Sequence, residues 1–93
     1  MTASLTRRRF VVSGRVQGVG FRWLARHWAG KLGLSGWARN REDGCVEAEV
    51  EGSAQAVAEF DRQLHLGPAG SHVDAVETVA LRPEGGPPSF NIT

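Results

Sequence analysis

The chain has 93 residues, of which 41% are hydrophobic, and this length allows a single domain, residues 1–93, with one modest core. The single cysteine, Cys45, excludes an intramolecular disulfide and any metal site built from several cysteines. The net charge is only +1, yet residues 1–41 contain all but two of the 11 Lys and Arg residues and no acidic residue, which favours a focused anion site over a surface that binds a polyanion.

The first predicted element is a strand over residues 9–15, where apolar and polar positions alternate and β-branched residues are frequent. Residues 1–6 are expected to form a disordered tail, and Arg7-Arg8-Arg9 a solvated entrance to the strand. The N-terminus does not resemble a signal peptide, and no apolar run approaches the roughly 20 residues that span a membrane. We therefore expect a cytoplasmic protein with no membrane partner.

A glycine-rich stretch follows, with the sequence Gly14-Arg15-Val16-Gln17-Gly18-Val19-Gly20-Phe21-Arg22. Its glycines allow positive φ angles and a close approach of the backbone to a ligand. Backbone N–H groups in such a turn, followed by a helix N-terminus, form a concave anion site, and Arg22 adds a planar charged group that matches phosphate oxygens. The stretch therefore predicts a phosphate site, in which Gln17 is expected to be a spacer. Arg15 either adds to the positive field or is a solvated strand residue.

A helix is predicted from Phe21 to the stop signal at Gly33, because apolar residues recur with the spacing of one helical face. That face consists of Phe21, Leu24, Ala25, Trp28, Ala29 and Leu32. His27 lies off the face and is interpreted as a partly exposed helix residue rather than a catalytic base.

A hairpin is predicted next, formed by strands over residues 34–40 and 45–51. The pair Asp43-Gly44 between them is a strong hairpin signal. Trp37 is expected to be the largest anchor of the first strand. In the second strand, Glu47, Glu49 and Glu51 alternate with apolar residues, and they are expected to face water rather than a metal ion.

The second half of the chain predicts one more helix and two more strands. Ser53 is the expected N-cap of the helix, its core stripe is Val57, Phe60 and Leu64, and Gly67 ends it. Residues 72–82 are predicted to be a strand whose imperfect alternation indicates a bulge or an exposed edge. A loop over residues 83–88 leads to a short closing strand at 89–92.

This order predicts an α+β sandwich of the ferredoxin-like, split β-α-β type. The elements read βαββαβ plus a short terminal strand, in an antiparallel-dominated sheet with both helices on one face. The fold hosts many functions, so it does not by itself identify one.

Two motifs resemble the acylphosphatase family. They are the Gly14–Arg22 stretch and Gly36-Trp37-Ala38-Arg39-Asn40, and the similarity extends at matching spacing from Phe10 to Ile92. The resemblance implies hydrolysis of the carboxyl–phosphate bond of acyl phosphates to a carboxylate and inorganic phosphate.

The roles implied by the resemblance fall on the same motifs. Arg22 would bind the phosphoryl group and Asn40 would orient the attacking water, with no metal or organic cofactor. The backbone N–H groups of the loop would hold the remaining phosphate oxygens; the loop residues are Arg15, Val16, Gln17, Gly18, Val19 and Gly20.

The chain departs from the family pattern at three places. Arg41 replaces a hydroxyl residue, Ala25 replaces a threonine, and the usual basic and aromatic residues after Ile92 are missing. These departures bear on stability and rate more than on the reaction. Arg41 either adds a phosphate contact or points into solvent.

The expected partner is a small-molecule acyl phosphate, and the protein is expected to be a monomer that binds no nucleic acid. One alternative is a domain that binds phosphate or carbamoyl phosphate without turnover. The other is an RNA-binding module, which would stack bases on the open face of the sheet, where the three glutamates are expected to repel a phosphate backbone.

Overall fold

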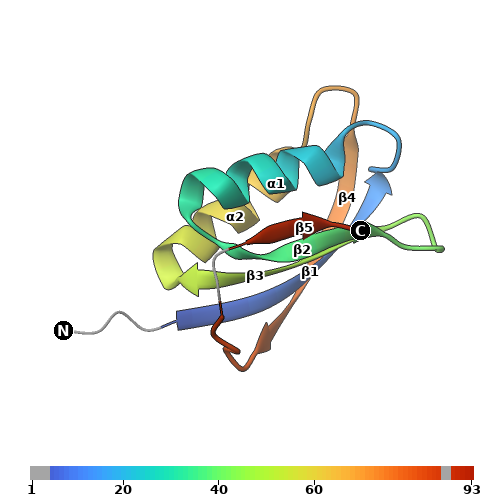
Figure 1. Cartoon of the computed structure of the whole chain (residues 1–93). Helices are drawn as coiled ribbons and strands as arrows, with labels where there is room; N and C mark the ends of the chain where they lie inside the picture. Colours follow the sequence, from blue (N-terminus) through green and yellow to red (C-terminus); the bar gives the residue numbers. More distant parts are fainter. Residues whose placement is uncertain (1–4, 87–88) are drawn as a thin grey trace.

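The structure is a computed structural model, and it describes residues 5–86 and 89–93. The elements, in chain order, are β1 (Leu5–Arg15), α1 (Phe21–Leu32), β2 (Ser35–Asn40), β3 (Val46–Ser53), α2 (Ala54–Leu66), β4 (His72–Leu81) and β5 (Phe90–Ile92). The described strands form one sheet in the order β4-β1-β3-β2-β5, in which the β2–β5 pair is parallel and the other pairs are antiparallel. Both helices pack on one face of it (Figure 1). The predicted ferredoxin-like α+β fold is confirmed.

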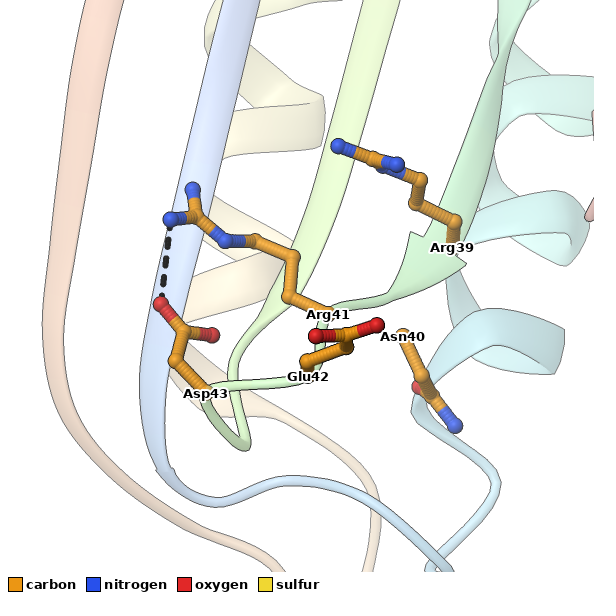
Figure 2. A pocket seen from close by; sticks show the side chains of 5 residues that line it. All are labelled: Arg39, Asn40, Arg41, Glu42 and Asp43. Atoms are coloured by element: carbon orange, nitrogen blue, oxygen red, sulfur yellow. Dashed lines mark ion pairs between the residues drawn. The ribbon is translucent and has the colours of Figure 1, made fainter.

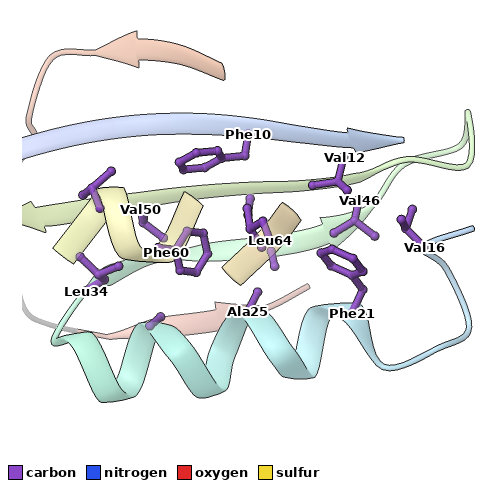
Figure 3. Packing of buried hydrophobic residues seen from close by; sticks show 14 residues of the cluster. Phe10, Val12, Val16, Phe21, Ala25, Leu34, Val46, Val50, Phe60 and Leu64 are labelled. Atoms are coloured by element: carbon purple, nitrogen blue, oxygen red, sulfur yellow. The ribbon is translucent and has the colours of Figure 1, made fainter. Parts of the chain in front are cut away.

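The core lies between the sheet and the helices (Figure 3). It includes the predicted stripe of α2, Val57, Phe60 and Leu64, each at most 1% exposed, and the rings of Phe10 and Phe60 lie 5.6 Å apart. The Ser53 side chain accepts a hydrogen bond from the N–H of Ala56, as predicted for an N-cap.

The N-terminal strand is longer than the sequence predicts. β1 begins at Leu5, because Leu5 pairs with Ser53 and Thr6 with Gly52 on β3. The assignment of these two residues to a disordered tail is therefore wrong. The rest of that tail, residues 1–4, lies outside the described residues.

Trp37 is not the core anchor of β2. Its neighbour Ala38 is fully buried under the helices, and because side chains alternate along a strand, Trp37 points to the other face. There it is half-buried, with the guanidinium of Arg39 5.9 Å from the centre of its ring. We call the sheet face opposite the helices the open face.

The glutamate row, Glu47, Glu49 and Glu51, does not face water as expected. Each side chain on the open face is buried, with 4–6% of the residue exposed. Their cover comes from arginines on the flanking strands: Arg9 Nε donates to Glu49 Oε1 at 3.2 Å, and Arg39 Nε donates to Glu47 Oε1 at 2.7 Å. In the register, Arg9 lies opposite Glu49 and Arg39 opposite Glu47, so opposite charges meet across neighbouring strands.

Arg7 is likewise not a solvated residue, since only 7% of it is exposed. Its Nε donates to Glu49 Oε2 at 2.6 Å and its Nη1 to Glu51 Oε1 at 3.3 Å. Glu51 also accepts hydrogen bonds from the backbone N–H groups of Glu84 (2.6 Å) and Gly85 (2.9 Å). The carboxylate of Glu51 therefore ties the loop after β4 to the centre of the sheet.

We expect this contact to make stability depend on acidic pH. The N–H of Glu84 lowers the pKa of Glu51 most; burial opposes this, and the N–H of Gly85 and Arg7 lower it further. Because the folded pKa lies below the ordinary value of 4.5, ionised Glu51 stabilises the fold above that value, and the free energy of unfolding should fall as pH drops below it.

Urea denaturation tests this contact with the substitution Glu51→Gln. Between about pH 5 and pH 3, the free energy of unfolding of Glu51→Gln should depend less on pH than that of wild type. Glu42→Gln, at an exposed turn position, is the matched control. Parallel curves for wild type and Glu51→Gln would contradict the assignment.

The imperfect alternation of β4 predicted a bulge or an exposed edge, and the strand has both. It is an edge strand, and its pairing with β1 shifts where Ser13 lies opposite Ala75 but Gly14 lies opposite Val73, which leaves Asp74 as the extra residue. Within the described residues, no helix has the length and apolar character needed to cross a membrane.

Candidate functional site

The loop between β1 and α1 is anchored in the core at both ends. Val16 is 1% exposed and Phe21 is 2% exposed, and Figure 3 shows both at the end of the core that contains Val12 and Val46. The residues between these anchors form a turn. Residues 15–20 are called the phosphate loop below, after the role that the sequence predicts for them.

The glycines of the stretch serve two different purposes. Gly18 (φ 77°) and Gly20 (φ 84°) have left-handed backbone conformations, and a Cβ on either would meet nothing within 4 Å, so the need is conformational. Gly14 lies in β1, where a Cβ would overlap the carbonyl oxygen of His72 on β4. The first glycine therefore permits strand pairing, and only the later two shape the loop.

The loop leads into a helix end that suits an anion. Gly20 is the N-cap of α1, no side chain of the described residues caps the helix, and its first turn contains no acidic residue. Among the described residues, no side chain or other segment accepts a hydrogen bond from the backbone N–H groups of residues 16–20. The N–H groups and the positive end of the helix dipole can therefore act on a bound anion.

Arg22 lies in the first turn of α1 and is half-buried. Its Nη1 donates to the main-chain oxygen of Thr93 at 3.2 Å, and the N–H of Thr93 donates to the carbonyl oxygen of Ala38 at 2.9 Å. Arg22 makes no ion pair with an Asp or Glu side chain within the described part of the chain. The guanidinium thus reaches the edge where β5 meets β2, and its charge is available to a ligand.

Asn40 is the last residue of β2 and is exposed. It has the same strand phase as Ala38, which is buried under the helices, so its side chain belongs to the helix-covered side of the sheet. Figure 2 shows it pointing away from the side chains of Arg39 and Arg41. Its amide has no hydrogen-bond partner among the described residues and can bind water.

The side chain of Gln17 brings the phosphate loop to the turn between β2 and β3. Its Nε2 donates to the carbonyl oxygens of Arg41 at 2.7 Å and Cys45 at 2.9 Å. The interpretation of Gln17 as a spacer is therefore wrong. Sequence reasoning missed these bonds because the acceptors are backbone groups 24 and 28 residues away, which leave no pattern in the sequence.

The turn after Asn40 contains charged residues that pair with one another. A pocket of about 610 Å³ is lined by Asn40 and its neighbours Arg39, Arg41, Glu42 and Asp43 (Figure 2). Arg41 pairs with Asp43 at 3.0 Å. The N–H of Cys45 lowers the pKa of Asp43 most, and Arg41 lowers it further, so Asp43 is ionised at neutral pH. Figure 2 shows that the Arg41 side chain points away from the Asn40 side chain.

Three segments that are separate in sequence meet at one end of the molecule: the phosphate loop, the β2–β3 turn and the end of β5 (Figure 1). The structure thus brings Arg22 and Asn40 to the same end of the fold. Arg15 lies at the exposed end of β1, opposite His72, and makes no ion pair within residues 5–86 and 89–93. Such a cluster, with an arginine, a free amide and unpaired N–H groups, can bind a phosphate and a water molecule together.

Known proteins share both the sequence and the fold. A family model described as Acylphosphatase matches residues 8–92. Acylphosphatases of Koribacter versatilis and Anaeromyxobacter dehalogenans are 48% and 49% identical, over 99% and 97% of this chain and 84% and 97% of theirs. The crystal structure of acylphosphatase from Bacillus subtilis is similar with a TM-score of 0.90 and 38% identity, covering 97% of this chain and 99% of that one. A full-length HypF, solved in a phosphate- and nucleotide-bound form, has a TM-score of 0.91 and 28% identity, but only 12% of its chain is covered.

Proposed function

Because this chain belongs to the acylphosphatase family and hydrolyses acyl phosphates to a carboxylate and inorganic phosphate, we propose that the phosphate loop, Arg22 and Asn40 carry out the reaction. The observation that carries this proposal is their arrangement. Arg22 is joined through Thr93 to β2, and Asn40 projects from the end of β2 on the side where α1 packs.

Each group has a role that suits its chemistry. The N–H groups of the phosphate loop donate to the phosphoryl oxygens, and Arg22, which stays protonated, neutralises the charge that phosphoryl transfer spreads over the equatorial oxygens. Neither Arg22 nor Asn40 can act as a base at neutral pH. The Asn40 carbonyl accepts a hydrogen bond from a water molecule and so fixes its position.

The proposed hydrolysis needs no side chain that acts as a base. The water oxygen bonds to phosphorus while the bond from phosphorus to the acyl oxygen breaks, and the electron pair leaves with the carboxylate. A strong base is unnecessary because the carboxylate is a good leaving group. The proton of the water can therefore pass to the phosphate itself. The pH dependence of kcat should therefore lack an essential group with a histidine-like pKa, and finding one would contradict this step.

The residues of the site supply charge and hydrogen bonds by themselves, so we expect no metal requirement. Hydrolysis of benzoyl phosphate should proceed at an unchanged rate after incubation with EDTA and gel filtration. A loss of activity that added Mg²⁺ or Zn²⁺ restores would contradict the metal-independent mechanism. A folded wild-type protein with no turnover would instead favour phosphate binding without catalysis.

We further propose that the protein acts as a cytoplasmic monomer without a nucleic-acid partner. The nearly balanced net charge of +1 supports the absence of a nucleic-acid partner. Repulsion by the glutamate row no longer counts against RNA, because arginines neutralise that row. The same ion pairs nevertheless cover the face on which bases would stack.

A further inference from the structure

The side chain of Gln17 makes a directed contact between the phosphate loop and the segment that carries Asn40. Its Nε2 donates to two backbone carbonyl oxygens, those of Arg41 and Cys45, at 2.7 and 2.9 Å. The NH₂ group of an amide has two hydrogens to donate, whereas the amide oxygen has none. With two carbonyls as partners, the nitrogen must face the turn, and both of its hydrogens are used.

The two acceptors are the two ends of the β2–β3 turn. Arg41 directly follows Asn40, and the N–H of Arg41 donates to the carbonyl oxygen of Cys45 at 2.8 Å. Gln17 therefore binds the base of the turn on both sides. A shift of the Gln17 side chain would therefore displace Arg41, the residue that directly follows Asn40.

Two residues at the ends of the loop hold it by apolar packing. Val16 and Phe21 are buried, but hydrophobic packing has no preferred direction. In the described part of the chain, no side-chain hydrogen bond other than those of Gln17 joins the phosphate loop to residues 39–45. Gln17 is thus the group that can set the distance between the two segments.

We propose that Gln17 is a positioning residue: it fixes the separation between the phosphate loop and Asn40, so that the water lies in line with the bond that breaks. This inference rests on the proposed roles of the loop and of Asn40. In-line attack needs reacting atoms about 3–3.5 Å apart, and a displacement of about 1 Å can cost roughly 10²-fold in rate.

The substitution Gln17→Met tests this, because it keeps the length of the side chain and removes both donors. We expect kcat for benzoyl phosphate to fall about 10- to 100-fold. The inhibition constant of inorganic phosphate should stay within about threefold of wild type, because the loop N–H groups and Arg22 remain. A kcat within about twofold of wild type, or equal losses in kcat and phosphate affinity, would overturn the proposal.

Gln63→Met is the matched control. Gln63 lies on α2, and its side chain likewise donates a hydrogen bond, at 2.8 Å to Glu59. Its kcat should equal that of wild type. A loss of rate there as large as in Gln17→Met would show a general effect on stability and count against positioning.

A double-mutant cycle separates the positioning role from the proposed function. On the Asn40→Ala background, Gln17→Met should change kcat by less than about twofold, because no oriented water is left to position. If Asn40→Ala loses rate and Gln17→Met still causes its full loss on top, positioning is wrong while the role of Asn40 stands. If Asn40→Ala keeps the wild-type rate, both fail.

Gln17→Glu provides an independent readout if the methionine variant does not fold. A carboxylate facing two carbonyl oxygens is repelled, whereas a protonated carboxyl can donate one hydrogen bond. The ratio of variant to wild-type kcat should therefore rise as pH falls from about 7 to about 5. A ratio that does not change with pH would overturn the proposal.

Discussion

Replacing Arg22 with alanine should lower kcat/KM for benzoyl phosphate by about 10²–10³, equivalent to roughly 3–4 kcal/mol of transition-state stabilisation. Arg22 is the charged residue in the first turn of α1, directly after the phosphate loop, and among the described residues it has no competing ion pair with an Asp or Glu side chain. Its loss would leave the developing charge on the phosphoryl oxygens without a cation. Binding of inorganic phosphate should weaken as well, because the same charge acts on the product.

Arg26→Ala is the matched control for this experiment. Arg26 is an exposed arginine on the same helix, and its guanidinium stacks on Trp23 with 4.7 Å to the ring centre. Removing it changes the net charge by the same amount at a distance from the loop. A large loss in Arg26→Ala would point to the general field of the helix, and full activity of folded Arg22→Ala would remove Arg22 from the mechanism.

The substitution Asn40→Ala should cause a loss of similar size, about 10²–10³, confined to kcat. Asn40 has no hydrogen-bond partner among the described residues, and its expected contact is with the attacking water rather than with the phosphate. The inhibition constant of inorganic phosphate should therefore change little. This separation of kcat from phosphate binding distinguishes Asn40 from Arg22.

The control for Asn40 is Asn91→Ala, which removes an exposed asparagine from the neighbouring strand β5. Because Asn91 pairs with Trp37, its side chain shares the phase of the open face. Its kcat should stay near the wild-type value. Equal loss of phosphate affinity and kcat in Asn40→Ala would mean that Asn40 contacts the phosphoryl group itself.

Elements with a strong local pattern could be predicted from the sequence. The period of α1, its glycine stop, and the Ser53 cap of α2 all depend on residues within a few positions of one another, and the structure confirms them. The Asp43-Gly44 turn is of the same kind, with Gly44 at φ 92°. The positions of Arg22 at a helix start and of Asn40 at a strand end follow from these local elements.

The open face of the sheet could not be predicted in the same way. Alternation showed that Glu47, Glu49 and Glu51 share one face, but not what covers that face. Their arginine partners lie on other strands, and only the register places them opposite the glutamates. Trp37 was misplaced for the same reason, since the identity of a large side chain does not tell which phase of a strand the helices cover.

The sequence by itself determined the local setting of the residues proposed for the chemistry: a glycine turn before a helix, an arginine in the first helical turn and an asparagine at the end of a strand. Only the tertiary structure decided how these groups are held together. The bonds of Gln17 to the carbonyl groups of Arg41 and Cys45 and the contact of Arg22 with Thr93 join segments 24 to 71 residues apart. Their acceptors are main-chain oxygens, which every residue possesses, so folding selects them by position in space and no residue type marks them in the sequence.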